Sequence, residues 1–166
     1  MKTYSTFVST IIVMTNKIED AIKSIHKMAN TTKTVINLMY TSRMVEEAIM
    51  TTLKPYELTI PQYNVLRILR GQKGNPANLS TLQERMIDKS SNTTRLVDKL
   101  IKKGWVERQT CEANRRKVEI FITEKGLEIL KELDPITERN NEDILKSLSA
   151  SQLEELNELL DTLRTN

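Results

Sequence analysis

The sequence contains little of several residue types. It has one cysteine (Cys111), one histidine (His26), four glycines, four prolines and only 4% aromatic residues. A single cysteine excludes an intramolecular disulfide and a cysteine-based zinc site, and it suits a reducing cytoplasm. The apolar run Ile11 to Met14 is too short to span a bilayer, so we expect no membrane partner and no signal peptide. The scarcity of glycine and proline favours a mainly helical protein.

Patterns typical of enzymes are also lacking. We find no paired carboxylates in a plausible pocket, no glycine-rich phosphate loop and no nucleophile next to a base. The lone His26 is followed by Lys27 and is expected to be an ordinary surface residue. The sequence therefore predicts no enzymatic activity, no catalytic residue, no cofactor and no metal site.

Positive charge is concentrated in the middle of the chain. Residues 59–126 contain 14 Lys or Arg and 7 Asp or Glu, so their net charge is +7, whereas the whole chain carries only +3. The flanking segments together therefore carry −4. A separate basic centre is typical of a protein that binds a polyanion, although chance clustering on a soluble surface gives the same count.

Residues 90–104 predict an amphipathic helix within this basic centre. One face holds the apolar or small side chains Thr93, Val97, Leu100 and Ile101. The opposite face, which we call the cationic face, holds Asn92, Arg95, Lys99, Lys102 and Lys103. Ser90 or Ser91 is expected to cap the helix and Gly104 to end it. This chemistry suits a DNA major groove, and the alternative is an ordinary amphipathic surface helix.

Two strands are predicted after Gly104. Val106, Arg108 and Thr110 alternate with polar residues, and Val118, Ile120 and Ile122 alternate again after a polar turn. The turn contains three cations, Arg115, Arg116 and Lys117. Because neighbouring cations repel one another, contact with phosphates or a minor groove explains them better than folding stability does, although a merely solvated tip is the alternative.

Helices are predicted on both sides of this region. Apolar residues recur at helical spacing over residues 17–28 and 31–53, and Pro55 ends the second helix. Capping boxes at Thr59 and Ser80 each open a helix, and a turn over residues 87–89 separates the second of these from the helix of residues 90–104. The region after Thr123 is helical with a kink or break at Pro135. Ser149 or Ser151 caps a last helix whose leucines are spaced as in a coiled coil, at Leu153, Leu156, Leu160 and Leu163.

The order of these elements predicts a mainly α protein with a small β-hairpin. The segments LTIPQYNVLRILRG (58–71), LSTLQERM (79–86) and SSNTTRLVDKLIKKGWVERQTCEANRRKVEIFITEKG (90–126) resemble the multiple-antibiotic-resistance regulator (MarR) family of winged helix-turn-helix regulators. The most specific part runs from Thr94 to Arg108. The resemblance implies dimerisation helices at 31–57 and 124–166 and a winged helix-turn-helix lobe at 58–123. It says nothing about residues 1–30, which we expect to form an N-terminal arm with a short helix.

The resemblance implies a cytoplasmic homodimer that binds pseudo-palindromic double-stranded DNA, acts as a repressor and is often released by a small ligand or an oxidant. By position, it implies base-edge contacts by Ser91, Asn92, Thr94 and Arg95. The phosphate and wing candidates are Lys99, Lys102, Lys103, Arg108, Arg115, Arg116 and Lys117, of which Arg116 matches the wing arginine of the family. A second reading is a winged-helix protein-interaction module whose basic face binds an acidic protein.

The sequence departs from the family pattern in two places. Its first 30 or so residues go beyond the common pattern, and residue 114 in the wing differs. Asn114 stands where the family usually has an aspartate that fixes the wing. Oxidant-sensing members carry their cysteine near the first dimerisation helix, whereas Cys111 lies in the expected wing and is expected to be a plain wing residue. The resemblance places the family's ligand crevice near Met39, Tyr40, Arg43, Met44, Tyr63 and Trp105. Taken singly, each of these residues fits an ordinary core role better than a ligand contact. The ligand and the regulated genes cannot be named from the sequence.

Overall fold

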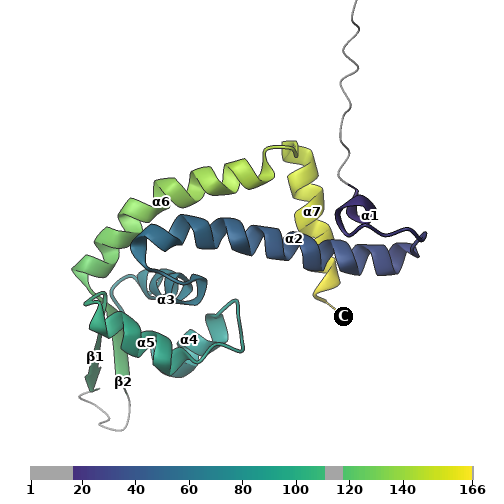
Figure 1. Cartoon of the computed structure of the whole chain (residues 1–166). Helices are drawn as coiled ribbons and strands as arrows, with labels where there is room; N and C mark the ends of the chain where they lie inside the picture. Colours follow the sequence, from purple (N-terminus) through teal and green to yellow (C-terminus); the bar gives the residue numbers. More distant parts are fainter. Residues whose placement is uncertain (1–16, 111–117, 166) are drawn as a thin grey trace, which may run out of the picture. The chain divides into compact units, whose positions relative to one another are not determined.

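The computed structural model describes residues 17–110 and 118–165 (Figure 1). The predicted wing-tip residues Cys111, Asn114, Arg115, Arg116 and Lys117 therefore lie outside the described residues, as does most of the N-terminal arm. The chain divides into two compact units, one that ends at Arg43 and one that begins at Met44. Each unit is described by itself.

The first unit contains α1 (Ile18–Ala21) and the beginning of α2 (Asn30–Leu53). The apolar spacing over residues 17–28 predicted a longer first helix, and this prediction was wrong beyond Ala21. Lys23 has a left-handed backbone with φ of +54°, and Ile25 is 89% exposed. The segment is too short to form a stable helix without packing, so only the turn around the buried Ile18 is helical. Glu19 and Lys33 form an ion pair of 2.7 Å.

In the second unit, α2 ends before the 3₁₀ turn η1 (Lys54–Tyr56), which contains Pro55. Thr59 then caps α3 (Ile60–Arg70) through the predicted capping box: its side chain accepts from the Gln62 amide, and the Gln62 side chain accepts from the Thr59 amide. The predictions for these two helices are confirmed. Most of the inward face of α3 is apolar, and it buries Tyr63, Val65, Leu66 and Leu69.

The next helix, α4 (Leu79–Arg85), has a different cap from the predicted one. Asn78, and not Ser80, accepts a 2.8 Å hydrogen bond from the Thr81 amide. Ser80 lies inside the first turn and donates to the Asn78 side chain at 2.5 Å. The prediction of a capping box at Ser80 was therefore wrong, because asparagine two residues earlier is an equally good N-cap.

The basic amphipathic helix is α5 (Thr93–Lys102). Neither Ser90 nor Ser91 caps it, contrary to the prediction. The cap is Asn92, whose Oδ1 accepts a 3.0 Å hydrogen bond from the Arg95 amide, because the two serine hydroxyls are bound to Asp88 instead. The predicted left-handed termination is confirmed, since Gly104 has φ of +72°.

The predicted hairpin is also confirmed. Strands β1 (Val106–Thr110) and β2 (Val118–Ile122) are antiparallel, with Val106 paired to Ile122 and Thr110 to Val118. Ala77, in the loop before α4, makes an additional bridge to Ile120 through hydrogen bonds of 3.0 and 2.8 Å. This bridge, which the sequence pattern did not reveal, fixes the hairpin to the loop between α3 and α4.

After the hairpin come two helices, α6 (Glu124–Leu145), capped by Thr123, and α7 (Ala150–Leu163), capped by Ser149 as predicted. The prediction at Pro135 was a kink or a break, and the break was wrong, because α6 runs through Pro135. A proline removes only one helical donor, and the flanking turns keep theirs. Gly126 is required by packing, because a Cβ atom there would lie 2.2 Å from the Trp105 carbonyl oxygen.

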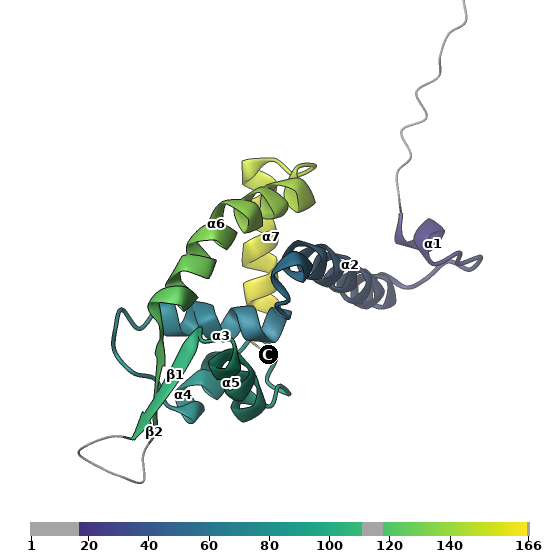
Figure 2. The ribbon, with the colours of Figure 1, turned by 60° about the vertical axis from the view of Figure 1, so that its left-hand side comes forward.

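One hydrophobic core joins α2 to α6 and the hairpin in the second unit, and no residue of α7 belongs to it. It includes Leu53 of α2, Leu66 of α3, Leu82 of α4, Leu100 of α5, Ile120 of β2, and Leu130 and Leu133 of α6. Figures 1 and 2 show α3, α4 and α5 grouped together, with the hairpin beside them and α6 running away from the group. The predicted class, mainly α with a two-stranded hairpin, is confirmed.

Candidate nucleic-acid interface

The exposed side of α5 carries most of the predicted cationic face. Asn92, Thr94, Arg95, Lys99 and Lys102 are exposed. On the opposite side, Thr93, Val97 and Leu100 are buried. Because helix periodicity assigned the same residues to each side, sequence and structure agree on how α5 faces solvent.

Three of these cations have no anionic partner within the part of the chain that the structure describes. Arg95, Lys99 and Lys102 make no ion pair there, so their charges stay available to a polyanion. They are three or four residues apart, which places them on neighbouring turns of one helix face. The surface can therefore neutralise a row of phosphates without first breaking an internal ion pair.

Lys103 is placed differently. It is only partly exposed, its Nζ lies 3.3 Å from Glu57 Oε2, and it stands 4.7 Å above the centre of the Trp105 ring. Glu57 is in the loop between η1 and α3. Lys103 thus joins the end of α5 to this loop through its ion pair with Glu57, and it also makes a cation–π contact with Trp105. Its ammonium group therefore already has partners inside the protein.

Arg108 in β1 also has an internal partner. Its guanidinium donates a 2.8 Å hydrogen bond to Asp98 Oδ1 on α5. Sequence reasoning did not single out Asp98. The sequence did contain a signal for this role, because Asp98 is an acidic residue among the cations of the basic helix. The pair connects the first wing strand to α5 and offsets one positive charge on this surface.

The turn before α5 is organised by Asp88. Its Oδ1 accepts hydrogen bonds from the Ser90 amide at 2.9 Å and from the Ser90 hydroxyl at 2.6 Å, and its Oδ2 accepts one from the Ser91 hydroxyl at 2.8 Å. These bonds hold the pKa of Asp88 below its usual value. Sequence reasoning missed this role, although an aspartate followed two residues later by a serine is typical of an Asx turn.

Contacts from α3 and α4 hold the same turn in place. The Asn64 side chain accepts a 2.9 Å hydrogen bond from the Ile87 amide, and the Gln83 amide group donates to the Lys89 carbonyl at 2.8 Å. Gln83 also accepts a hydrogen bond from the Thr93 hydroxyl. The start of α5 is thus fixed from two neighbouring helices, which is the arrangement a rigid recognition element requires.

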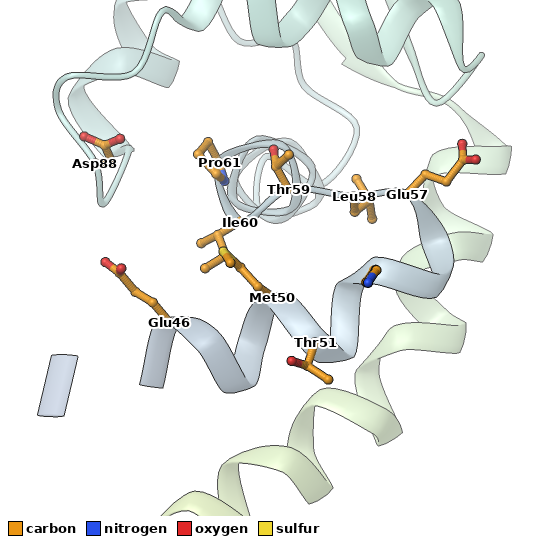
Figure 3. Close-up of a pocket in the computed structure, with 10 residues that line it drawn as sticks. Glu46, Met50, Thr51, Glu57, Leu58, Thr59, Ile60, Pro61 and Asp88 are labelled. Carbon is orange, nitrogen blue, oxygen red and sulfur yellow. The ribbon is translucent and has the colours of Figure 1, made fainter. Parts of the chain in front are cut away.

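A groove of about 660 Å³ lies in the second unit (Figure 3). It is lined by Glu46, Met50, Thr51 and Lys54 of the α2–η1 segment, by Glu57, Leu58, Thr59, Ile60 and Pro61, and by Asp88. None of the six predicted ligand-pocket residues lines it: Tyr63 is buried in the core, and Trp105 is covered by Lys103. Those six assignments stay predictions.

Within residues 17–110 and 118–165, no helix is both long and apolar enough to cross a membrane. No group of histidine, cysteine and carboxylate side chains in the same segments is arranged to hold a metal ion.

Helix α4 and the basic helix α5 are joined by the turn that Asp88 fixes, and the hairpin that follows is the wing. This arrangement defines a winged helix-turn-helix protein. Residues 58–118 match the MarR family. They are a MarR-family domain, and the chain has the fold of a MarR-family transcription regulator, which confirms the resemblance stated from the sequence.

Solved structures agree. A MarR transcription factor from Planctomyces limnophilus is 29% identical, with 82% of this chain and 99% of that chain covered and a TM-score of 0.65. BpsR of Bordetella bronchiseptica, whose DNA binding is regulated by 6-hydroxynicotinic acid, is 19% identical over 85% and 99%, with a TM-score of 0.73. The organohalide-sensing regulator RdhR-CbdbA1625, bound to 2,4-dichlorophenol, is 19% identical over 84% and 82%, with a TM-score of 0.76.

Proposed function

We propose that this protein is a sequence-specific DNA-binding transcription regulator that acts as a homodimeric repressor on a pseudo-palindromic operator. The observation that carries the proposal is the exposed row of Arg95, Lys99 and Lys102 on α5, next to a hairpin and without internal ion pairs among the described residues. A helix of this kind fits a major groove, and two such helices in a dimer would reach successive grooves about 34–36 Å apart.

The proposed roles follow the chemistry of each side chain. Ser91, Asn92, Thr94 and Arg95 contact base edges at the beginning of α5, and Lys99 and Lys102 contact phosphates along it. Arg108 binds phosphate only when its ion pair with Asp98 opens. Lys103 binds phosphate only when its ion pair with Glu57 opens. Arg115, Arg116 and Lys117 are proposed as wing contacts from the sequence resemblance.

Dimerisation is supported by apolar side chains that one chain leaves exposed. Leu156, Leu159 and Leu163 of α7 are 38, 62 and 54% exposed, and α7 buries none of its residues. On α2, Val35, Met39 and Met44 are 55, 69 and 56% exposed. A second copy of the chain that packs on these faces would remove them from water, which is the usual reason for such surfaces.

A small effector is proposed for the groove described above. Two of its lining residues bind the segments that flank α5: Asp88 binds the serines before the helix, and Glu57 binds Lys103 after it. A ligand there could favour one arrangement of the DNA-binding helix over another and so shift the population that binds DNA. The regulators that bind 6-hydroxynicotinic acid and 2,4-dichlorophenol are precedents among similar folds.

The proposal is tested by electrophoretic mobility shift of the full chain on its own upstream DNA and on random DNA, at several salt concentrations. Lys102→Ala should weaken binding to both DNAs alike and reduce the salt slope by roughly 0.9. Arg95→Ala should weaken upstream binding more than random binding. Lys103→Ala, which removes an internally paired cation, should change the slope less than Lys102→Ala does.

Binding to neither DNA, or binding unaffected by both Arg95→Ala and Lys102→Ala, would reject the assigned DNA face. The alternative of an acidic protein partner would then be examined. Nucleic acid that purifies with the protein, measured as the 260/280 nm absorbance ratio, distinguishes the two functions before any operator is known.

A further inference from the structure

Two of the base-edge candidates have one of their hydrogen-bonding functions already occupied inside the protein. Ser91 donates its hydroxyl proton to Asp88 Oδ2 at 2.8 Å. Asn92 uses its side-chain oxygen to accept the Arg95 amide at 3.0 Å. Both residues lie at the solvent-facing start of α5, where Ser91 is half-buried and Asn92 is exposed.

The direction of each bond follows from the groups involved. An ionised carboxylate can only accept, so the bond between Asp88 and Ser91 consumes the single proton of the serine hydroxyl. The hydrogen bonds to Asp88 favour its charged form. A backbone amide can only donate, so the atom of Asn92 that faces the Arg95 amide must be the oxygen and not the nitrogen.

What remains for a ligand is the complementary half of each side chain. The Ser91 oxygen retains a lone pair but has no proton to donate. Asn92 retains both amide protons, whereas one lone pair of its oxygen is used by the helix cap. In a major groove, adenine N6 and cytosine N4 are donors, whereas guanine N7 and O6, adenine N7 and thymine O4 are acceptors.

We propose, on the basis of the DNA-binding function above, that these intramolecular bonds set the base preference of the recognition helix: Ser91 reads a donor edge, adenine N6 or cytosine N4, and Asn92 reads an acceptor edge. The acidic Asp88 is a positioning residue, since it acts through Ser91.

The rigidity of the turn supports this assignment. Asp88 also binds the amide and hydroxyl of Ser90, and the Asn64 side chain holds the neighbouring Ile87 amide. If Asn92 turned its oxygen towards a base, α5 would lose its N-cap, at a cost comparable to the hydrogen bond it gained. Both side chains are therefore expected to contact DNA in the orientations that they have in this structure.

The test is selection of bound sequences from a pool of random duplex DNA by the full-length protein and by variants. Asn92→Ser keeps a good N-cap but removes the amide donor, so its melting temperature should stay close to that of the wild type while the preference at one position is lost. Ser91→Ala should remove the preference for one base pair at a different position. Ser90→Ala is the matched control, because it also loses a bond to Asp88 but is not a base-edge candidate.

Base analogues then identify the atoms. Purine, which lacks the 6-amino group, in place of adenine, or 2-pyrimidinone in place of cytosine, should weaken wild-type binding roughly 3- to 10-fold at the Ser91 position, about the size of one neutral hydrogen bond. The same base analogues should leave DNA binding by the Ser91→Ala variant unchanged.

The outcomes separate the two proposals. No enrichment of any sequence by the wild type overturns the DNA-binding function itself. Binding that the base analogues leave unchanged at the Ser91-dependent base pair overturns the assignment of Ser91, because these analogues remove the major-groove amino donor that the proposal requires. Enrichment that Asn92→Ser leaves unchanged, in a variant that is folded, overturns the assignment of Asn92.

Discussion

Arg108 Nη2 lies 2.8 Å from Asp98 Oδ1, so a cation of the first wing strand is bound to the one acidic residue on the exposed face of α5. Both side chains remain partly exposed. An exposed pair of this kind contributes only about 0.2–1 kcal/mol to stability. Its larger consequence is electrostatic, because Asp98 places a negative charge among Arg95, Lys99 and Lys102 and occupies Arg108.

We therefore expect Asp98→Asn to strengthen DNA binding. The substitution removes a charge that repels phosphates and releases Arg108, so affinity for random DNA should rise several-fold at low salt, with a salt slope steeper by up to roughly 0.9. Fluorescence anisotropy with a labelled duplex across a salt series measures both quantities. Glu132→Gln, an equal charge change on the exposed side of α6, is the control and should have little effect. Unchanged or weaker binding by Asp98→Asn would show that this pair does not face DNA.

The cap of α4 gives a prediction about stability alone. Asn78→Ala removes the acceptor for the Thr81 amide and should lower the free energy of unfolding by about 1 kcal/mol. Ser80→Ala removes only a side-chain donor inside the first turn and should change it by less than about 0.5 kcal/mol. Urea unfolding followed by circular dichroism compares the two. A larger loss of stability for Ser80→Ala than for Asn78→Ala would show that Ser80, and not Asn78, caps α4.

The hydrogen bonds to Asp88 predict a dependence on pH. Because its pKa is lowered in the folded protein from a usual value of 3.8, the stability that this carboxylate contributes is present above that value and is lost as the pH falls through the lowered pKa. The melting temperature of the wild type should therefore exceed that of Asp88→Ala at pH 6, and the difference should shrink as the pH falls below about 4. Differential scanning calorimetry from pH 3 to 7 measures it. A difference that stays constant over this range would mean that the carboxylate charge is not responsible.

The proposed dimer predicts a specific effect of α7. Leu159 is 62% exposed in the single chain, so Leu159→Lys should leave the fold of the chain intact but place a charge in the dimer interface. Sedimentation equilibrium should then show a shift from dimer towards monomer. Asn157→Lys, on the same helix and also exposed, is the control that should stay dimeric. A wild type that sediments as a monomer at micromolar concentration would contradict the dimer directly.

Local sequence signals determined most of the elements of this fold. The period of the apolar residues predicted α2, α3 and α5, the alternation around Val106 and Ile120 predicted the hairpin, and Gly104 marked the left-handed end of α5. Such features depend on residues within a few positions of one another, and helix periodicity and backbone conformational preference act over that range. The same local signals were insufficient where several neighbouring residues could serve as a cap, as at Asn78 and Asn92.

The sequence by itself determined which side of α5 is buried and which side is cationic, because the order of side chains along a helix fixes both faces. Only the tertiary structure decided which of those cations remain available. Lys103 is bound to Glu57, 46 residues earlier, and Arg108 to Asp98, 10 residues earlier on another element. Their pairing depends on how α5 packs against the loop before α3 and against β1, and no pattern along the chain encodes the distance between two side chains that only folding brings together.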